Sequence, residues 1–279
     1  MKNSLIILLI FNCLNLKAQS FSDFIKQNSI EVSKLDTIND LIFERIKDQK
    51  CILLGEMHGT EEPAKFLTGL VKTLVKNNKK VLLGLEIPSS DMIGFTLKKT
   101  KKQLTKTNFF SVGEGDGRNS KAWFQLILSC SKLKNVDFCF FDFKNEKSNF
   151  NPKNRDSLMF CNLKSEYLKD TSRIIVALSG NIHNKIELFR GEKTFGCFAK
   201  DYFLNDKIMS ISCQYDSGTM HNRTYEGLKI REIKGQGGAF LAATNMTNFF
   251  LFKIPKSFTK DYSAILFTKF ITASVSIEQ

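Results

Sequence analysis

The sequence predicts an α/β protein of three layers (α/β/α), with helices on both faces of a mainly parallel central sheet. Short, strongly apolar runs such as Cys51–Gly55 and Ile174–Leu178 are typical of strands that are buried on both faces. Amphipathic helical stretches separate these runs, as in parallel sheets whose strands are joined by crossover helices. Beyond Cys213 strand-like runs follow one another without such helices, which predicts extra C-terminal strands, partly antiparallel.

The first twenty residues have the features of a secretory signal peptide. Lys2 gives a basic start, Leu5–Leu16 is apolar, and the small residues Ala18 and Ser20 allow a cut after either position. The apolar run is too short for a transmembrane anchor. We therefore expect an exported protein, periplasmic or secreted, without a transmembrane segment, whose residues 21–279 form one α/β domain.

Apolar residues at helical spacing predict the helices of the remaining chain. Between residues 61 and 77, for example, they recur every third or fourth position and form one apolar face. Serine or asparagine side chains before two helices can cap their first turns. The predicted helices are Phe21–Ser33, Thr37–Lys47, Glu61–Asn77, a short helix from near Asp91, Asn119 or Ser120 to Leu133, Arg155–Leu168 and Thr194–Phe203.

Runs rich in β-branched and aromatic residues predict the strands. Pro88 ends the second of them, and the polar run Ser217–Thr224, which contains His221, reads as an exposed loop. The predicted strands are Cys51–Gly55, Val81–Ile87, Val136–Phe141, Ile174–Leu178 and Ile208–Cys213, followed by Tyr225–Ile233, Phe249–Ile254 and Ser263–Thr268.

The charge of the chain is strongly positive but spread along the sequence. The net charge is +13 at pH 7, and most of the basic residues are lysines. Recognition of nucleic acids concentrates arginine and aromatic side chains on one face. The distribution therefore predicts a solvated basic surface and no nucleic-acid partner.

The cysteines do not form the paired spacing of a zinc–thiolate cluster. Cys51 and Cys139 fall within predicted strands, and Cys130 and Cys161 fall within predicted helices. These positions favour buried free thiols over a disulfide framework in a domain of this size. Export permits disulfides, and the sequence assigns no particular pair.

Polar side chains follow four predicted strands at the point where each strand ends. They are Glu56 and His58, Glu86, Asp142, and Asn181 with His183. The carboxyl ends of parallel strands meet at one edge of a sheet, where open α/β proteins bind their ligands. We therefore expect these side chains to face a shared functional crevice.

Histidine and carboxylate together suit two kinds of chemistry. A histidine exchanges protons near neutral pH, and a carboxylate bonded to its other nitrogen fixes its tautomer, so Glu56 or Glu86 can orient His58. The same types of atom hold divalent metals, with Glu56, His58 and His183 as the candidate ligands. Glu-Met-His differs from the helical His-Glu-x-x-His zinc motif.

Two further segments carry candidate residues. The loop Gly113–Ser120 lacks the Lys-Ser/Thr ending of a phosphate-binding loop. It either aims Arg118 from a helix start at an anionic or carbonyl oxygen, or forms a tight turn with a surface arginine. Asp156 suits the N-terminal dipole of its helix. Ser179 lacks the Gly-x-Ser-x-Gly context of a nucleophilic serine, which disfavours a serine hydrolase.

A set of short motifs resembles a known superfamily. In chain order they are Leu54–Glu61, Leu85-Glu86, Asp116–Ser120, Arg155-Asp156-x-x-Met159 and Ser179–His183. Together they resemble the superfamily that joins erythromycin esterases, ChaN-type haem-uptake proteins and Tiki-type proteases, over most of the chain. The Glu-x-His spacing is closer to the ChaN-like branch than to the Glu-x-x-His of the esterases.

The resemblance implies a three-layer fold with its active crevice at the strand ends. Carried over by motif, the catalytic residues are Glu56, His58, Glu86, Arg118 and His183, supported by Asp116, Arg155, Asp156 and Asn181.

Three functions follow as hypotheses. The first is an exported hydrolase of an ester or amide bond in a small-molecule substrate, in which His58 activates water while His183 and Arg118 stabilise the oxyanion. The second is an uptake protein that binds haem or a metal ion in the same crevice. The third is a metal-dependent peptidase.

Overall fold

The computed structural model describes residues 20–95, 101–111, 115–143, 155–204, 206–235 and 237–277. The predicted signal peptide, apart from Ser20, lies outside the described residues. The elements in chain order are α2 (Phe21–Asn28), β1 (Ile30–Glu31), α3 (Asp40–Ile46), β2 (Cys51–Glu56), α4 (Glu62–Lys76), β3 (Val81–Pro88), η1 (Ser89–Met92), α5 (Lys101–Leu104), α6 (Asn108–Ser111), α7 (Lys121–Cys130), β4 (Val136–Asp142), α8 (Arg155–Tyr167), β5 (Ile174–Gly180), α9 (Phe195–Phe203), β6 (Ile208–Thr224), β7 (Gly227–Lys234), α10 (Gly238–Ala243), β8 (Asn248–Phe252) and β9 (Ala264–Ile271).

A nine-stranded sheet forms the centre of the molecule. Eight strands follow the order β1-β8-β9-β6-β2-β5-β3-β4, and β7 pairs with β6 beside this path. The strands from β9 to β4 run parallel to one another. The pairs β1–β8, β8–β9 and β6–β7 are antiparallel. This arrangement confirms the predicted mainly parallel sheet with a partly antiparallel C-terminal extension.

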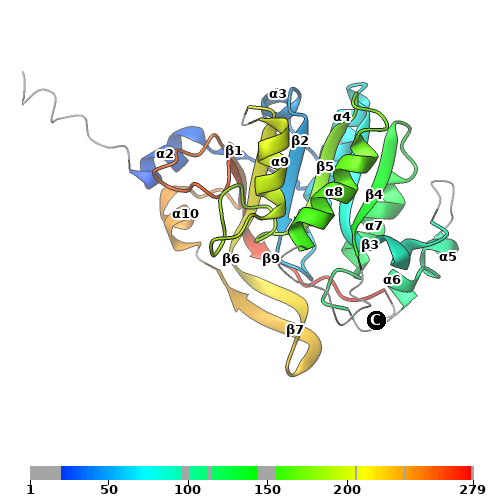
Figure 1. Cartoon of the computed structure of the whole chain (residues 1–279). Helices are drawn as coiled ribbons and strands as arrows, with labels where there is room; N and C mark the ends of the chain where they lie inside the picture. The colour runs from blue at the N-terminus through cyan, green and yellow to red at the C-terminus, as the bar shows by residue number, and fades with distance from the viewer. Residues whose placement is uncertain are drawn as a thin grey trace, which may run out of the picture.

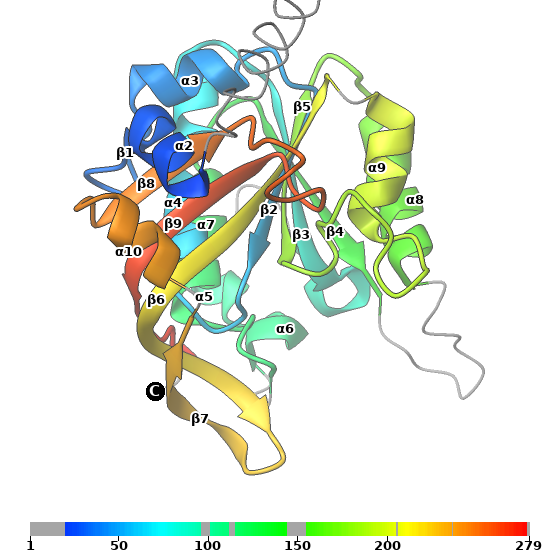
Figure 2. The ribbon, with the colours of Figure 1, turned by 90° about the vertical axis from the view of Figure 1, so that its left-hand side faces the viewer.

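Helices cover both faces of the sheet, as Figures 1 and 2 show from two directions. Helices α3, α4 and α7 cover one face; α8 and α9 cover the other, where α2 and α10 lie over β8 and β9. In β2 the fully buried side chains alternate between the two cores, with Ile52 and Leu54 on the first and Cys51 and Leu53 on the second. Burial on both sides explains why this strand is uniformly apolar.

The C-terminal half departs from the prediction at β6. This strand does not end at Cys213 but continues to Thr224 and forms a protruding hairpin with β7 (Figure 2). The run 217–224 is therefore a strand, and His221 is 2% exposed rather than a surface loop residue. The polar residues remain in strand conformation because β7 pairs with β6 from Ser217 onward, just before the pairing with β9 ends at Gly218.

Two helical predictions also need correction. The first helix ends at Asn28 instead of Ser33, because Ile30–Glu31 pairs with β8 at the edge of the sheet. A helix that the sequence analysis missed, α10, lies between β7 and β8, where Phe240 and Ala243 pack into the apolar cluster under α2. With only six residues, it is too short for its periodicity to be recognised.

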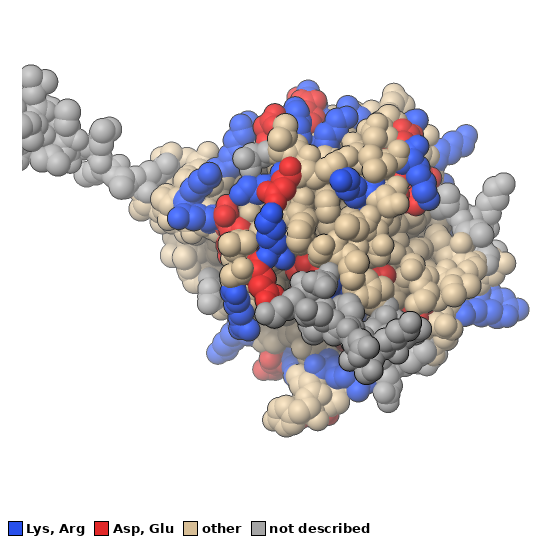
Figure 3. Space-filling view, in the orientation of Figure 1, with Lys and Arg blue, Asp and Glu red and all other residues tan. Residues whose placement is uncertain are grey.

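Charged side chains of both signs lie on the surface of the protein (Figure 3). Lys and Arg side chains alternate with acidic ones on the face shown in Figure 3. Within the described ranges, no helix combines the length and apolarity needed to cross a bilayer.

The cysteines from Cys51 onward are free thiols, and most are buried. Cys161 is exposed, because it lies on the outer side of α8, which corrects the expectation of a buried thiol there.

Candidate active site

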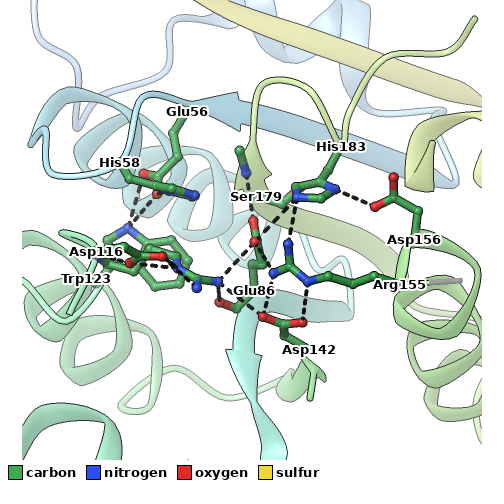
Figure 4. A network of polar contacts seen from close by, with 12 residues as sticks. Glu56, His58, Glu86, Asp116, Trp123, Asp142, Arg155, Asp156, Ser179 and His183 are labelled. Atoms are coloured by element: carbon green, nitrogen blue, oxygen red, sulfur yellow. Dashed lines mark hydrogen bonds and ion pairs between the residues drawn. The ribbon is translucent and has the colours of Figure 1, made fainter. Parts of the chain in front are cut away.

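Four adjacent parallel strands bring the predicted residues to one edge of the sheet. β2 ends at Glu56, β3 carries Glu86 near its end, β4 ends at Asp142, and β5 ends three residues before His183. The strands lie in the spatial order β2, β5, β3, β4, and Glu56 is in register with Gly180. Figure 4 shows their polar side chains close together, in two hydrogen-bonded groups: Glu56 and His58 with Trp123, and Glu86, Asp142 and His183 with the arginines between them.

Glu56 and His58 form the first carboxylate–histidine pair. The His58 Nδ1 lies 2.8 Å from the Glu56 Oε1. The indole Nε1–H of Trp123, on α7, donates to both Glu56 oxygens at 3.2 and 3.1 Å. The Glu56 side chain is fully buried, while the His58 side chain is 26% exposed. The carboxylate is thus fixed from two sides and presents the imidazole to solvent.

Burial and charge act in opposite directions on this pair. Burial raises the pKa of Glu56, although the hydrogen bonds from His58 and Trp123 oppose the rise. Burial acts to lower the pKa of His58, but the bond to Glu56 and the negative charge of Glu86 outweigh it, so this pKa is raised. The raised pKa makes His58 a stronger base than a free imidazole.

Asp156 and His183 form the second pair. The Asp156 Oδ1 is hydrogen-bonded to the His183 Nδ1. On the other side of the ring, the Arg155 Nη1 lies 3.1 Å from the His183 Nε2. Because a guanidinium can only donate, Nε2 accepts this bond and Nδ1 carries the proton that Asp156 receives. Both partners of His183 come from the first two residues of α8.

Glu86 lies between the two pairs. Its Oε1 is 3.0 Å from the Arg118 Nη1 and 2.7 Å from the Arg155 Nη2, and its Oε2 accepts the Gly180 N–H at 2.8 Å. Burial acts to raise the pKa of Glu86, but the positive charges of Arg118 and its neighbours outweigh burial and hold this pKa well below its usual value. Glu86 therefore remains a carboxylate.

Arg118 is fully engaged inside this network and is not a surface arginine. It contacts Asp116 through Nε and Nη2, and its Nη1 donates to the Glu86 carbonyl oxygen at 2.6 Å. Its Nη1 also lies 3.3 Å from the Asp142 Oδ2. Only 14% of its side chain is exposed. These contacts direct Arg118 towards carboxylates of the protein, so it braces the site.

Arg155 is the more accessible of the two guanidinium groups. Its Nε and Nη2 donate to the two oxygens of Asp142 at 3.1 and 2.8 Å. Its side chain is 29% exposed, and its Nη1 is directed at His183. The two-point contact with Asp142 fixes the plane of the guanidinium.

One predicted residue lies outside the network and one contributor was missed. The Asn181 side chain donates to the Cys213 carbonyl oxygen of β6 at 3.2 Å, so it fastens the strand end instead of facing the crevice. Trp123 was not predicted as a site residue. The one signal in the sequence was that a buried tryptophan needs an acceptor for its indole N–H. Asp142, which was predicted at a strand end of the crevice without a particular role, binds Arg155 and Arg118.

The two imidazoles face each other across Gly180. A methyl group at Gly180 would lie 3.3 Å from the His58 Nε2 and 3.6 Å from the His183 Cδ2. Among the described residues, the His58 Nε2 makes no hydrogen bond, because its partner Glu56 binds the other nitrogen. The His58 Nε2 therefore remains without a protein partner among the described residues, on a side chain that is 26% exposed.

The donor set does not suit the expected metal site. Among the described residues no three His, Cys, Asp or Glu side chains are grouped as metal ligands. The Glu56 oxygens are bonded to His58 and Trp123, the His183 Nε2 faces the Arg155 guanidinium, and Arg118 and Arg155 lie beside Glu86. The described residues thus form a hydrogen-bonded network of acid, base and guanidinium groups.

Comparisons with solved structures identify the fold. No family model and no curated protein sequence matches the chain. A Bacillus cereus protein matches with a TM-score of 0.65 at 11% identity, over 91% of this chain and 98% of that chain. A succinoglycan biosynthesis protein matches with a TM-score of 0.63 at 12% identity, over 91% and 97%.

The erythromycin esterase EreC, a histidine-to-asparagine mutant in its open conformation, matches with a TM-score of 0.51 at 10% identity, over 86% of this chain and 95% of that chain. ChaN of Campylobacter jejuni with bound haem matches with a TM-score of 0.38 at 14% identity, over 63% and 85%. The matches with TM-scores above 0.5, EreC among them, show that the chain shares the fold of these proteins.

Proposed function

We propose that the protein is an exported hydrolase that cleaves an ester or amide bond of a small-molecule substrate with a water molecule activated by His58. The observation that carries the proposal is the Glu56–His58 pair: the His58 Nε2 makes no hydrogen bond among the described residues and lies, like the His183 ring, beside Gly180. The predicted signal peptide supports export. The shared fold with an esterase is consistent with hydrolysis.

His58 acts as the general base. Glu56 accepts the Nδ1–H, which leaves a lone pair on Nε2 to take a proton from water. The buried carboxylate, held in turn by Trp123, stabilises the imidazolium that forms when the proton is taken. The activated water then attacks the carbonyl carbon directly, and no covalent intermediate is required.

Arg155 faces the negative charge that develops on the carbonyl oxygen, and His183, whose two ring nitrogens are bonded to Asp156 and Arg155, positions the guanidinium instead of donating to the oxygen itself. Asp156 and Arg155 hold His183, and Arg155 is itself fixed by Asp142 and Glu86. Donors held in place before the reaction are effective because they do not reorganise in the transition state. We assign the charge stabilisation to Arg155 and the bracing role to Arg118, because Arg118 is the less accessible of the two.

Substitution of the two histidines tests the proposal. We expect His58→Ala to lower turnover of an ester panel by about 10²- to 10⁴-fold, the contribution of a general base, and His183→Ala to lower it as well, because Arg155 loses the ring that holds it. Circular dichroism checks that each variant is folded. Added imidazole is expected to restore part of the activity of His58→Ala only, because it can replace a general base beside Glu56 but cannot fix the Arg155 guanidinium as the tethered His183 ring does.

Two results would contradict the assignment. Full activity in either variant would remove that histidine from the chemistry. A Soret shift upon haem addition that is lost in His58→Ala, in a protein that hydrolyses no ester or amide, would favour the haem-binding hypothesis instead. Inhibition of proteolysis by a chelator would favour the metal-dependent peptidase.

A further inference from the structure

The protruding β6–β7 hairpin is fastened to the loop that carries His58. The His221 N–H, in the outer half of β6, donates to the Gly59 carbonyl oxygen at 3.0 Å, and the Ser274 N–H donates to the same oxygen at 2.8 Å. Past Gly218, β6 has only β7 as a neighbour among the described strands. The backbone of His221 therefore links the hairpin to the residue that follows His58.

The second active-site loop meets the same point. A Cβ atom at Gly59 would lie 2.0 Å from the His221 carbonyl oxygen, and one at Gly117 would lie 2.4 Å from that oxygen and 2.9 Å from the Gly59 Cα. Both glycines have positive φ, +82° and +102°. Only glycine allows three backbone segments to approach so closely. We call Gly59, Gly117 and the backbone of His221 the glycine junction.

The glycine junction adjoins two members of the catalytic network. Gly59 directly follows His58, and Gly117 directly precedes Arg118. Arg118 in turn contacts the side chain and the carbonyl oxygen of Glu86. The position of the base relative to the central carboxylate thus depends on a backbone contact that β6 supplies.

We propose that the glycine junction positions the active site: it sets where His58 lies relative to Glu86 and Arg118, and it couples the β6–β7 hairpin to the crevice. The expected effect of the junction on turnover rests on the proposed function. It has an independent consequence for the titration of His58, which is sensitive to the distances from Glu56 and Glu86.

The substitution Gly117→Ala tests the proposal. We expect kcat to fall about 100-fold with little change in KM, because a small misplacement of reacting groups has an effect of that size. NMR titration is expected to show the pKa of His58 lowered towards that of a free imidazole, since the junction no longer holds the loop. Only three histidine rings contribute to the spectrum.

Gly227→Ala is the matched control. Gly227 lies in the same hairpin with φ +89°, and an added Cβ meets nothing within 4 Å. This variant has the same backbone strain without the contact, so we expect wild-type kcat and an unchanged His58 titration. A loss of kcat equal to that of Gly117→Ala would overturn the proposal, because strain alone would then explain the effect.

A milder variant covers the case in which Gly117→Ala does not fold. Thr219→Val removes the acceptor of the Ala273 N–H, a 3.0 Å bond that fastens the C-terminal segment beside Gly59. It is expected to change kcat and the His58 pKa in the same direction, by less. Wild-type behaviour in both readouts would overturn the proposal. If no substrate is hydrolysed, the proposed function fails, and the NMR titration of His58 alone tests the role of the glycine junction.

Discussion

The two histidines of the crevice differ in the nitrogen that each leaves accessible. His58 is bonded to Glu56 through Nδ1, and its Nε2 faces Gly180. His183 is bonded through both nitrogens, with its Nε2 accepting from Arg155. Of the two rings, only that of His58 therefore keeps a nitrogen without a hydrogen-bond partner among the described residues, and we assign the two histidines different roles despite their similar carboxylate partners.

Replacement of Glu56 tests the tuning of the base. Glu56→Gln removes the negative charge that helps raise the pKa of His58, so that pKa falls. Because the unprotonated imidazole is the active form, activity is lost on the acid side of this pKa, and the acid limb of kcat/KM is expected to move to lower pH. At neutral pH we expect kcat to fall about 10²-fold or more, because the tautomer is no longer fixed.

The pH profiles of two variants provide the comparison. Glu61→Gln makes the same change at a glutamate that pairs with Lys65 on α4, and it is expected to keep the wild-type profile. An acid limb that stays in place in Glu56→Gln would show that Glu56 does not set the pKa of the base.

Local pattern predicted which residues gather, but not how they pair. The end of each apolar run marks the end of a predicted strand. Glu56, Glu86 and His183 could therefore be placed at one edge of the sheet from the sequence. The sequence left open whether Glu56 or Glu86 orients His58, and the structure shows Glu56. The indole of Trp123 reaches Glu56 from 67 positions away in the chain, and no local pattern encodes such a contact.

At the scale of elements, the packing of α8 on the sheet depends on a glycine. A Cβ atom at Gly84 in β3 would lie 3.0 Å from the Leu163 Cδ1 of α8 and 3.2 Å from Ala177 and Phe141. The first turn of α8 supplies Arg155 and Asp156. Close contact between α8 and β3 is thus a condition for placing both residues beside Glu86 and His183.

Overpacking at this position tests the contact. Gly84→Ala is expected to lower the free energy of unfolding by about 1–3 kcal/mol, because the added methyl group has no room. Urea denaturation followed by circular dichroism measures the change. Gly238→Ala, at the start of α10 where a Cβ meets nothing within 4 Å, is expected to be stabilising by about 0.4–1 kcal/mol. Equal effects at the two sites would contradict the packing argument.

Prediction of elements succeeded where the apolar pattern was long. Helix α4 was recognised because its fifteen residues repeat apolar side chains at helical spacing. Strands β2 to β5 were recognised because each is a continuous apolar run, buried on both faces. The outer half of β6 was missed because polar residues dominate it, and its strand conformation is fixed by pairing with β7 and not by burial of an apolar face.

At the scale of the whole molecule, no disulfide links the described residues. The six cysteines from Cys51 onward are free, and only Cys161 is exposed. Burial raises the pKa of Cys51 and of Cys213 well above the usual value of a thiol. We therefore expect stability to come from the three apolar clusters around the sheet.

Thiol reactivity checks this expectation. In protein that begins at Phe21, one thiol is expected to react rapidly with the reagent DTNB in the native state and all six in guanidinium chloride, because exposed thiolates react first. Cys161→Ser should remove the rapid phase and leave Tm unchanged by reducing agent. Fewer reactive thiols after unfolding would reveal a disulfide and contradict the structure.

The hydrogen bond between Trp123 and Glu56 has a practical consequence. Trp123 is the single tryptophan of the chain, it is fully buried, and its indole N–H lies against the carboxylate that orients His58. The tryptophan fluorescence, excited apart from that of the five tyrosines, therefore originates next to the Glu56–His58 pair. An unlabelled sample can report protonation of that pair and the arrival of ligands as a change in emission, which provides a direct assay before any substrate has been identified.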